Sequence, residues 1–203
     1  MKTRTINKET DRKIYNRLKR WLDHASEESI AEGLNWYSDA QQFTRDLSRE
    51  TGVDPYTVAA VVSALSPNNK WDRNKIDAAA IINAYITGQS FHTVKVCTYN
   101  ANKHKAIKLL QSKTRIRKLS PKTHAFAMNI GRLSGSHITI DRWHMRACIV
   151  DPKEGPRPCI ESPTIKQYQR IEQITARVAN DVGLLGYELQ AIIWLAIKSN
   201  WNR

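Results

Sequence analysis

The stretch Ile-Thr-Ile-Asp-Arg-Trp-His-Met-Arg, residues 138–146, joins a short apolar run to the start of a helix. Because isoleucine and threonine favour extended backbone, the first three residues predict an extended segment. Asp141 is a residue type that caps helix amino termini, since its carboxylate accepts hydrogen bonds from the unpaired backbone N–H groups there. The stretch therefore predicts a carboxylate at the amino end of a helix over 142–150.

Outward from this stretch, apolar residues recur at spacings of three and four, which is typical of helices packed on a core. Ser38 is expected to cap a helix that begins after Gly33, and Gly52 and Gly88 are expected to end helices. Segment 151–163, with four prolines and one glycine, is expected to be irregular. We therefore expect an all-α protein that forms one compact unit, without repeats. The predicted helices span 8–24, 38–50, 56–65, 72–86, 102–110, 123–130, 142–150, 164–182 and 187–200.

The chain is strongly basic. Its 203 residues contain 32 Lys and Arg against 19 Asp and Glu, a formal net charge of +13. Such a charge favours a polyanionic partner, above all nucleic acid, although it could also serve only to keep the protein soluble.

Other classes of protein find little support in the composition. The three cysteines, Cys97, Cys148 and Cys159, show no C-x-x-C pair and indicate neither a disulfide framework nor a zinc or iron–sulfur site. The six histidines form no metal-binding pair, and no apolar run approaches the roughly 20 residues that cross a bilayer. We therefore expect no cofactor, no metal, no membrane association and a cytoplasmic location.

Asp141 has a structural and a chemical interpretation. As a cap it would satisfy backbone N–H groups, and the same helix end would favour its ionised form. A fixed carboxylate stabilises positive charge that develops on a sugar whose glycosidic bond is breaking, and it can also orient or deprotonate water.

Lys122 precedes Asp141 by nineteen positions and follows a basic run over 113–118. An exposed lysine in such surroundings is typical of a phosphate contact. If packing beside Ala125 and Phe126 desolvates its amine, Lys122 could instead attack the deoxyribose C1′ and form a Schiff base.

The turn Ser-Pro-Asn-Asn, residues 66–69, follows a predicted buried helix. Turn chemistry alone accounts for these residue types. A polar turn fixed by proline could also occupy the space that a base leaves when it is extruded from a duplex. Trp71 and Trp143 are candidates for stacking on that base, whereas Trp21, Trp194 and Trp201 are expected in or near the core.

These motifs follow one another in the order found in the helix-hairpin-helix DNA glycosylase superfamily. The Leu-Ser-Pro-Asn turn at 65–68, Asn-Lys at 74–75, Lys-Thr at 122–123 and Ile-Asp at 140–141 with Arg146 resemble those of the endonuclease III and archaeal 8-oxoguanine glycosylase branches. The pattern over 66–74 is also similar to small phage-encoded relatives. The resemblance implies a two-lobed helical bundle with a cleft between the lobes.

The resemblance covers about 58–150 and implies a role for each matching residue. Lys122 corresponds to the Schiff-base lysine, Asp141 to the catalytic aspartate, Asn68 to the intercalating glutamine and Arg146 to the arginine that follows. Leu-Ser-Pro-Lys at 119–122 lacks the two hairpin glycines of the family, so the backbone cradle for phosphate is altered. The cysteine cluster of the iron–sulfur members and a second domain for base recognition are also absent.

The expected function is therefore excision of a damaged or modified base from double-stranded DNA, with abasic-site lyase activity through Lys122. The protein is expected to be a monomer in a bacterial or phage-infected cell and to be associated with the nucleoid when it is bound to DNA. A non-catalytic DNA-binding protein that kept the scaffold is the alternative, and a nuclease is disfavoured because no acidic cluster for magnesium is visible. For the base pocket the candidates are Trp143, His144 and Gln190, although a buried, hydrogen-bonded role for Gln190 is the simpler interpretation. The residues expected to contact or enter the duplex are Asn68, Asn69, Lys70, Trp71, Arg73, Thr123, Arg142 and Arg146.

Overall fold

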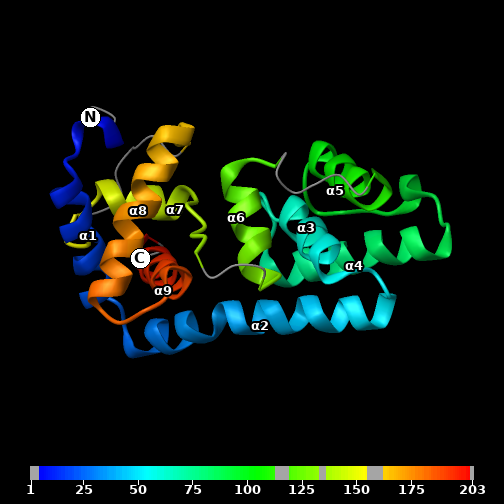
Figure 1. Cartoon of the computed structure of the whole chain (residues 1–203), viewed down its shortest axis with the longest axis horizontal. Helices are drawn as coiled ribbons and strands as arrows, with labels where there is room; N and C mark the ends of the chain where they lie inside the picture. The colour runs from blue at the N-terminus through cyan, green and yellow to red at the C-terminus, as the bar shows by residue number, and fades with distance from the viewer. Residues whose placement is uncertain (1–4, 113–118, 133–135, 155–161, 202–203) are drawn as a thin grey trace. The chain divides into compact units, whose positions relative to one another are not determined.

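The computed structural model describes residues 5–112, 119–132, 136–154 and 162–201 (Figure 1). Within these ranges the protein consists of α-helices and two short 3-10 helices, with no strand, which confirms the predicted all-α class. The short helices are η1 (Ile6–Lys8) and η2 (Phe91–Thr93). The α-helices are α1 (Asp11–Asp23), α2 (Glu27–Thr51), α3 (Pro55–Leu65), α4 (Trp71–Thr87), α5 (Asn100–Ser112), α6 (Pro121–Ile130), α7 (Arg142–Ile149), α8 (Ile165–Asp181) and α9 (Gly186–Trp201).

The chain divides into two compact units. Unit 1 combines Met1–Ser38 with Gly135–Arg203, and unit 2 is the intervening segment Asp39–Ser134. Helix α2 begins in unit 1 and ends in unit 2.

In unit 1, α1 packs against α7, α8 and α9. Ile14, Leu18 and Trp21 are fully buried, as their spacing of four and three predicts for one face of a helix. The Trp21 indole donates a 2.9 Å hydrogen bond to the carbonyl of Val150, so its buried N–H group is satisfied. Helix α1 begins at Asp11 rather than at residue 8, because Thr10 accepts a hydrogen bond from Lys13 N and caps it.

The prediction of a helix that starts at Ser38 is wrong. Helix α2 begins at Glu27 and runs through Gly33 and Ser38 without interruption. A Cβ atom on Gly33 would lie 2.5 Å from Cγ1 and 2.7 Å from Cα of Ile192 on α9. The glycine therefore permits close packing of two helices, and the helix ends only at Gly52, whose φ is +69°.

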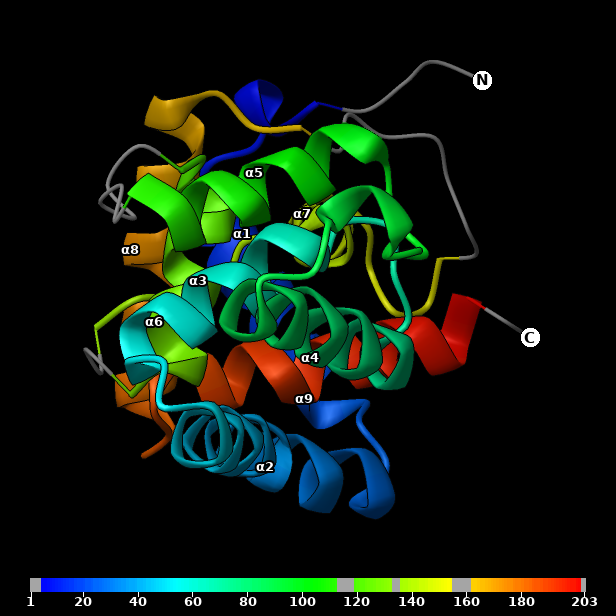
Figure 2. The ribbon, with the colours of Figure 1, turned by 90° about the vertical axis from the view of Figure 1, so that its right-hand side faces the viewer.

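Helix α3 is the central element of unit 2. Asp54 caps it, Pro55 starts its first turn, and every side chain from Val58 to Leu65 is buried. It packs against α4, α5 and α6, which surround it in Figure 2. The buried helix predicted over 56–65 is confirmed.

No single helix within the described ranges is long and apolar enough to cross a membrane. Helices α8 and α9 reach that length and composition only as a pair, bent by 98° at their junction.

Candidate functional site

Asp141 is the N-cap of α7, as predicted. Its Oδ1 accepts a 2.9 Å hydrogen bond from the backbone N–H of His144, and its backbone is extended (φ −101°, ψ −176°). The half-buried carboxylate thus lies at the positive end of the α7 dipole, which favours negative charge.

The segment before Asp141 forms no helix and pairs with no strand among the described residues. Side chains of α8 bind its backbone instead. The Tyr168 hydroxyl donates to the carbonyl of Ile138 at 2.7 Å and accepts from the N–H of Ile140 at 3.1 Å. Glu172 Oε1 accepts from the N–H of Ile138 at 3.1 Å. Two α8 side chains one turn apart therefore perform the role of a neighbouring strand.

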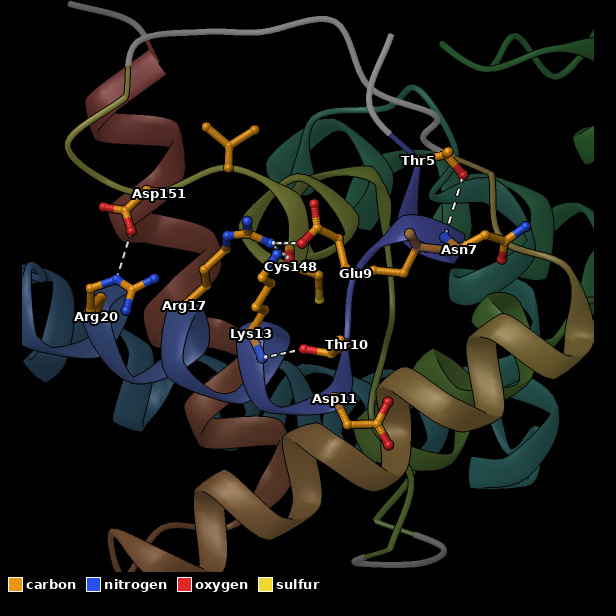
Figure 3. Close-up of polar contacts among 12 residues, drawn as sticks. Thr5, Asn7, Glu9, Thr10, Asp11, Lys13, Arg17, Arg20, Cys148 and Asp151 are labelled. Carbon is orange, nitrogen blue, oxygen red and sulfur yellow. Dashed lines mark hydrogen bonds and ion pairs between the residues drawn. The ribbon is translucent and has the colours of Figure 1, made fainter.

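The carboxyl end of α7 is anchored to α1 (Figure 3). Arg17 Nη1 donates to the carbonyl of Cys148 at 3.0 Å and lies 2.9 Å from Glu9 Oε2. Arg20 Nε forms a 2.6 Å ion pair with Asp151 just beyond the helix. The cation of Arg17 thus meets the negative end of the α7 dipole, while Asp141 occupies the positive end.

The His144 side chain lies in the core of unit 1, with no exposed surface. The Thr175 hydroxyl donates to the carbonyl of Ile171 at 2.8 Å, so it accepts the 2.9 Å bond from His144 Nε2. Within the described part of the chain, His144 Nδ1 has no hydrogen-bond partner. Burial lowers the pKa of His144 to about 4, so the ring is neutral near pH 7. Of the three base-pocket candidates, His144 is thus the one enclosed completely by protein.

The Arg146 guanidinium lies against two tryptophan rings. Its central carbon is 4.4 Å from the ring centroid of Trp143 and 5.1 Å from that of Trp201, and the two rings meet edge to face. Stacking on aromatic faces restricts the guanidinium and favours a fixed geometry. Arg142, in the first turn of the same helix, is exposed. The role of Trp201 was not visible in the sequence, because it lies on α9, far along the chain from α7.

Gln190 is buried in an aromatic part of unit 1. Its Oε1 accepts a 2.7 Å hydrogen bond from the Tyr37 hydroxyl, which confirms the buried, hydrogen-bonded interpretation. The Tyr37 ring meets Tyr187 at 5.2 Å between centroids, and Trp36 meets Trp194 at 5.9 Å.

In unit 2, the turn between α3 and α4 exposes Asn68. This residue has a φ of +57°, a left-handed conformation that asparagine tolerates better than most residues. Its Nδ2 donates to the hydroxyl of Tyr99 at 3.2 Å, and Thr98 Oγ1 donates to the carbonyl of Pro67 at 2.8 Å. The Tyr99 side chain, 65% exposed, was not singled out in the sequence because it lies outside any periodic helix. The turn is therefore braced against the segment that precedes α5.

Asp77 lies beneath the surface of the same region and binds several of its polar groups. Its fully buried carboxylate accepts from Asn69 Nδ2 at 2.9 Å and from the N–H of Cys97 at 2.7 Å. It also accepts from Arg73 Nε at 3.0 Å. Arg73 and Asn69, both expected at a DNA surface, thus bind this buried carboxylate, and the Arg73 side chain remains 43% exposed.

Two other residues expected to contact DNA lie at the amino end of α4. Lys70 is exposed at the N-cap position. The Trp71 ring, half-buried, meets the rings of Phe43 at 6.0 Å and Phe126 at 6.3 Å between centroids. Trp71 therefore joins the packing of unit 2 and keeps part of its ring at the surface.

Lys122 lies in the first turn of α6, half-buried, directly after Pro121. Pro121 starts the helix because its fixed φ suits the first helical position. Ser63 Oγ donates a 2.6 Å hydrogen bond to the carbonyl of Thr123, which joins this turn to α3. The basic residues Lys113, Arg115, Arg117 and Lys118 lie outside the described residues.

The candidate residues form two groups, one in each unit. The expected duplex contacts from Asn68 to Arg73, with Lys122 and Thr123, belong to unit 2, whereas Asp141, Arg142, Trp143, His144, Arg146 and Gln190 belong to unit 1.

Positive charge is concentrated in one part of the sequence. No aspartate or glutamate occurs from residue 78 to residue 140, most of which lies in unit 2. The same span contains ten of the chain's basic residues and so contributes +10 of the net charge of +13. These residues are Lys95, Lys103, Lys105, Lys108, Lys113, Arg115, Arg117, Lys118, Lys122 and Arg132.

In the described ranges, no three His, Cys, Asp or Glu side chains gather in an arrangement that could hold a metal ion. No curated protein and no solved structure matches the chain significantly. Residues 1–201 match a family model described as "Family of unknown function (DUF7178)". The match spans almost the whole sequence, and the chain therefore belongs to the DUF7178 family.

Proposed function

We propose that this protein is a DNA glycosylase of the helix-hairpin-helix type, which extrudes a damaged or modified base and breaks its glycosidic bond. The observation that carries the proposal is the placement of Asp141. Its carboxylate lies at the amino end of α7, and both the preceding segment and the opposite end of the helix are held by side chains of neighbouring helices.

Asp141 is proposed to stabilise the transition state. When the bond between deoxyribose C1′ and the base breaks, positive charge develops on the sugar, and a carboxylate already fixed in place stabilises it without reorganisation. The hydrogen bond from His144 N to Oδ1 restricts the orientation of that carboxylate.

Lys122 is proposed as the nucleophile. Its neutral amine forms a bond to C1′ as the glycosidic bond breaks, and the base departs with the bonding electrons and takes up a proton. Ring opening then yields a Schiff base, and loss of a C2′ proton expels the 3′ phosphate. Lys122 belongs to unit 2, whereas Asp141 belongs to unit 1.

Binding and extrusion are assigned to unit 2. The acid-free span from residue 78 to residue 140 supplies cations for backbone phosphates. The exposed turn with Asn68 supplies a rigid polar group to fill the space left by the extruded base.

The test combines a panel of lesion-bearing duplexes with borohydride trapping. Purified protein is expected to release one class of base and to leave a covalent adduct with abasic DNA when borohydride reduces the Schiff base. Release without an adduct would identify a glycosylase that lacks lyase activity.

A non-catalytic DNA-binding protein is the second candidate. The acid-free basic span favours it, because that span accounts for DNA binding without any chemistry. Salt-sensitive binding with neither base release nor adduct across the panel would establish this second function in place of the first.

A further inference from the structure

We infer that one face of α8, formed by Tyr168, Glu172 and Thr175, positions the Asp141 carboxylate. The main contribution of this face is the binding of the Tyr168 hydroxyl to the backbone that precedes Asp141. This inference rests on the proposed function, since the position of Asp141 matters most if the residue takes part in catalysis. It concerns residues that belong to none of the motifs discussed above and that bind the groups on either side of Asp141.

The α8 face holds the chain on both sides of Asp141. On the amino side, Tyr168 and Glu172 bind three backbone groups of Ile138 and Ile140. On the carboxyl side, Thr175 accepts from the ring of His144, whose own N–H binds Asp141 Oδ1.

The Tyr168 hydroxyl is suited to this role by its two simultaneous hydrogen bonds. It donates to one backbone group and accepts from another two residues away, and only 5% of the residue is exposed. A tyrosine that merely filled the core would need one partner for its hydroxyl. Here both bonds fix the segment that ends at Asp141.

Close packing limits the segment on another side. A Cβ atom on Gly186 at the start of α9 would lie 2.6 Å from Cδ1 of Ile138. If the α8 contacts were lost, the segment would therefore shift in directions that Gly186 does not block. A displacement of about 1 Å at a catalytic group can slow a reaction about 100-fold.

The test uses Tyr168→Phe, which keeps the ring and removes both hydrogen bonds. We expect amide hydrogen exchange of Ile140 and His144 to accelerate about 10-fold or more, while amides inside α3 keep their protection. We expect single-turnover base excision to slow by about 10- to 100-fold, with DNA affinity unchanged within about 3-fold. Tyr15→Phe is the matched control, because Tyr15 also binds α8, through a 2.6 Å hydrogen bond to Asp181.

A second pair of variants keeps the inference testable if Tyr168→Phe fails to fold. Thr175→Ser retains the hydroxyl that accepts from His144, and Thr175→Val removes it. Slower excision and faster His144 exchange are expected for the valine variant only.

Each outcome bears on one claim. Unchanged exchange of Ile140 and His144 in Tyr168→Phe and Thr175→Val overturns the inference, whether or not the protein excises a base. Faster exchange with an unchanged excision rate overturns it as well. A wild-type protein that excises no base contradicts the proposed function, and the exchange measurements still decide whether α8 holds the Asp141 segment.

Discussion

The buried carboxylate of Asp77 accepts a 2.9 Å hydrogen bond from the side chain of Asn69 and so ties the α3–α4 turn to the body of α4. The same carboxylate binds the backbone of Cys97, which draws the segment before α5 to this turn. A single buried charge thus supports the part of unit 2 that we propose enters the duplex.

Asp77→Ala is expected to lower the free energy of unfolding by about 3 kcal/mol, because it leaves buried donors without their acceptor. Urea denaturation measures the change. Asp72→Ala is the control, since Asp72 pairs with Lys75 on the same helix but its side chain is 89% exposed, and its loss should cost less than about 1 kcal/mol. Equal effects of the two variants would show that the Asp77 network is not important for stability.

Asp141→Asn should abolish base excision while leaving the fold and DNA binding almost unchanged. Asparagine caps helices as well as aspartate does, so stability is preserved, but the negative charge is lost. We expect the single-turnover rate to fall at least about 100-fold, with DNA affinity within a few-fold. Asp54→Asn, at the N-cap of α3, should leave the rate unaltered. An undiminished rate in Asp141→Asn would exclude this residue from catalysis.

Lys122→Gln should remove both the borohydride-trapped adduct and strand cleavage, because an amide cannot form a Schiff base. Denaturing gel electrophoresis of labelled abasic DNA detects both products. Lys95→Gln removes an exposed charge from the same acid-free span and should retain the adduct. If the adduct persists in Lys122→Gln, Lys122 is a phosphate contact and another amine is responsible.

Asn68→Ala should separate base extrusion from phosphate binding. Wild-type affinity should fall steeply with salt, with a slope of roughly −0.9 per phosphate contacted, and the variant should keep that slope because it loses no positive charge. The signal of a fluorescent base analogue opposite the turn should rise more slowly or not at all. If Asn68→Ala extrudes the base as the wild type does, the turn serves only to end α3, and Asn69 or Trp71 is the next residue to test.

His144 should make stability depend on pH. Burial lowers its pKa to about 4 in the folded protein, whereas the ordinary value of 6.5 applies to the unfolded chain. Between these pH values the unfolded state binds more protons than the folded state. The contribution of His144 to the free energy of unfolding is therefore complete above about pH 6.5 and is lost as the pH falls toward 4, by up to about 1.4 kcal/mol per pH unit. His144→Gln should flatten this dependence in urea denaturation at pH 7 and pH 5. An unchanged dependence would assign it to other groups.

Local sequence signals determined much of the fold. The spacing of Ile14, Leu18 and Trp21 defined the buried face of α1, and Pro55 and Pro67 bracketed the buried helix α3. The cap at Asp141 was also predictable, because an N-cap depends on a side chain and a backbone N–H three residues apart. These features depend on neighbours within one or two turns, and a sequence contains all of that information.

Tertiary contacts decided the rest. Gly33 resembles a helix end in sequence, but the approach of Ile192 makes it an interior position of α2. Tyr168 binds the segment before Asp141, and Trp201 stacks on Arg146, although neither lies near its partner in the chain. Such contacts depend on which faces of distant helices meet, and that is set by packing of the whole core rather than by local propensity. The sequence thus determined the Asp141 cap and most of the helices, whereas the tertiary structure decided the extent of α2 and what holds the Asp141 carboxylate in place.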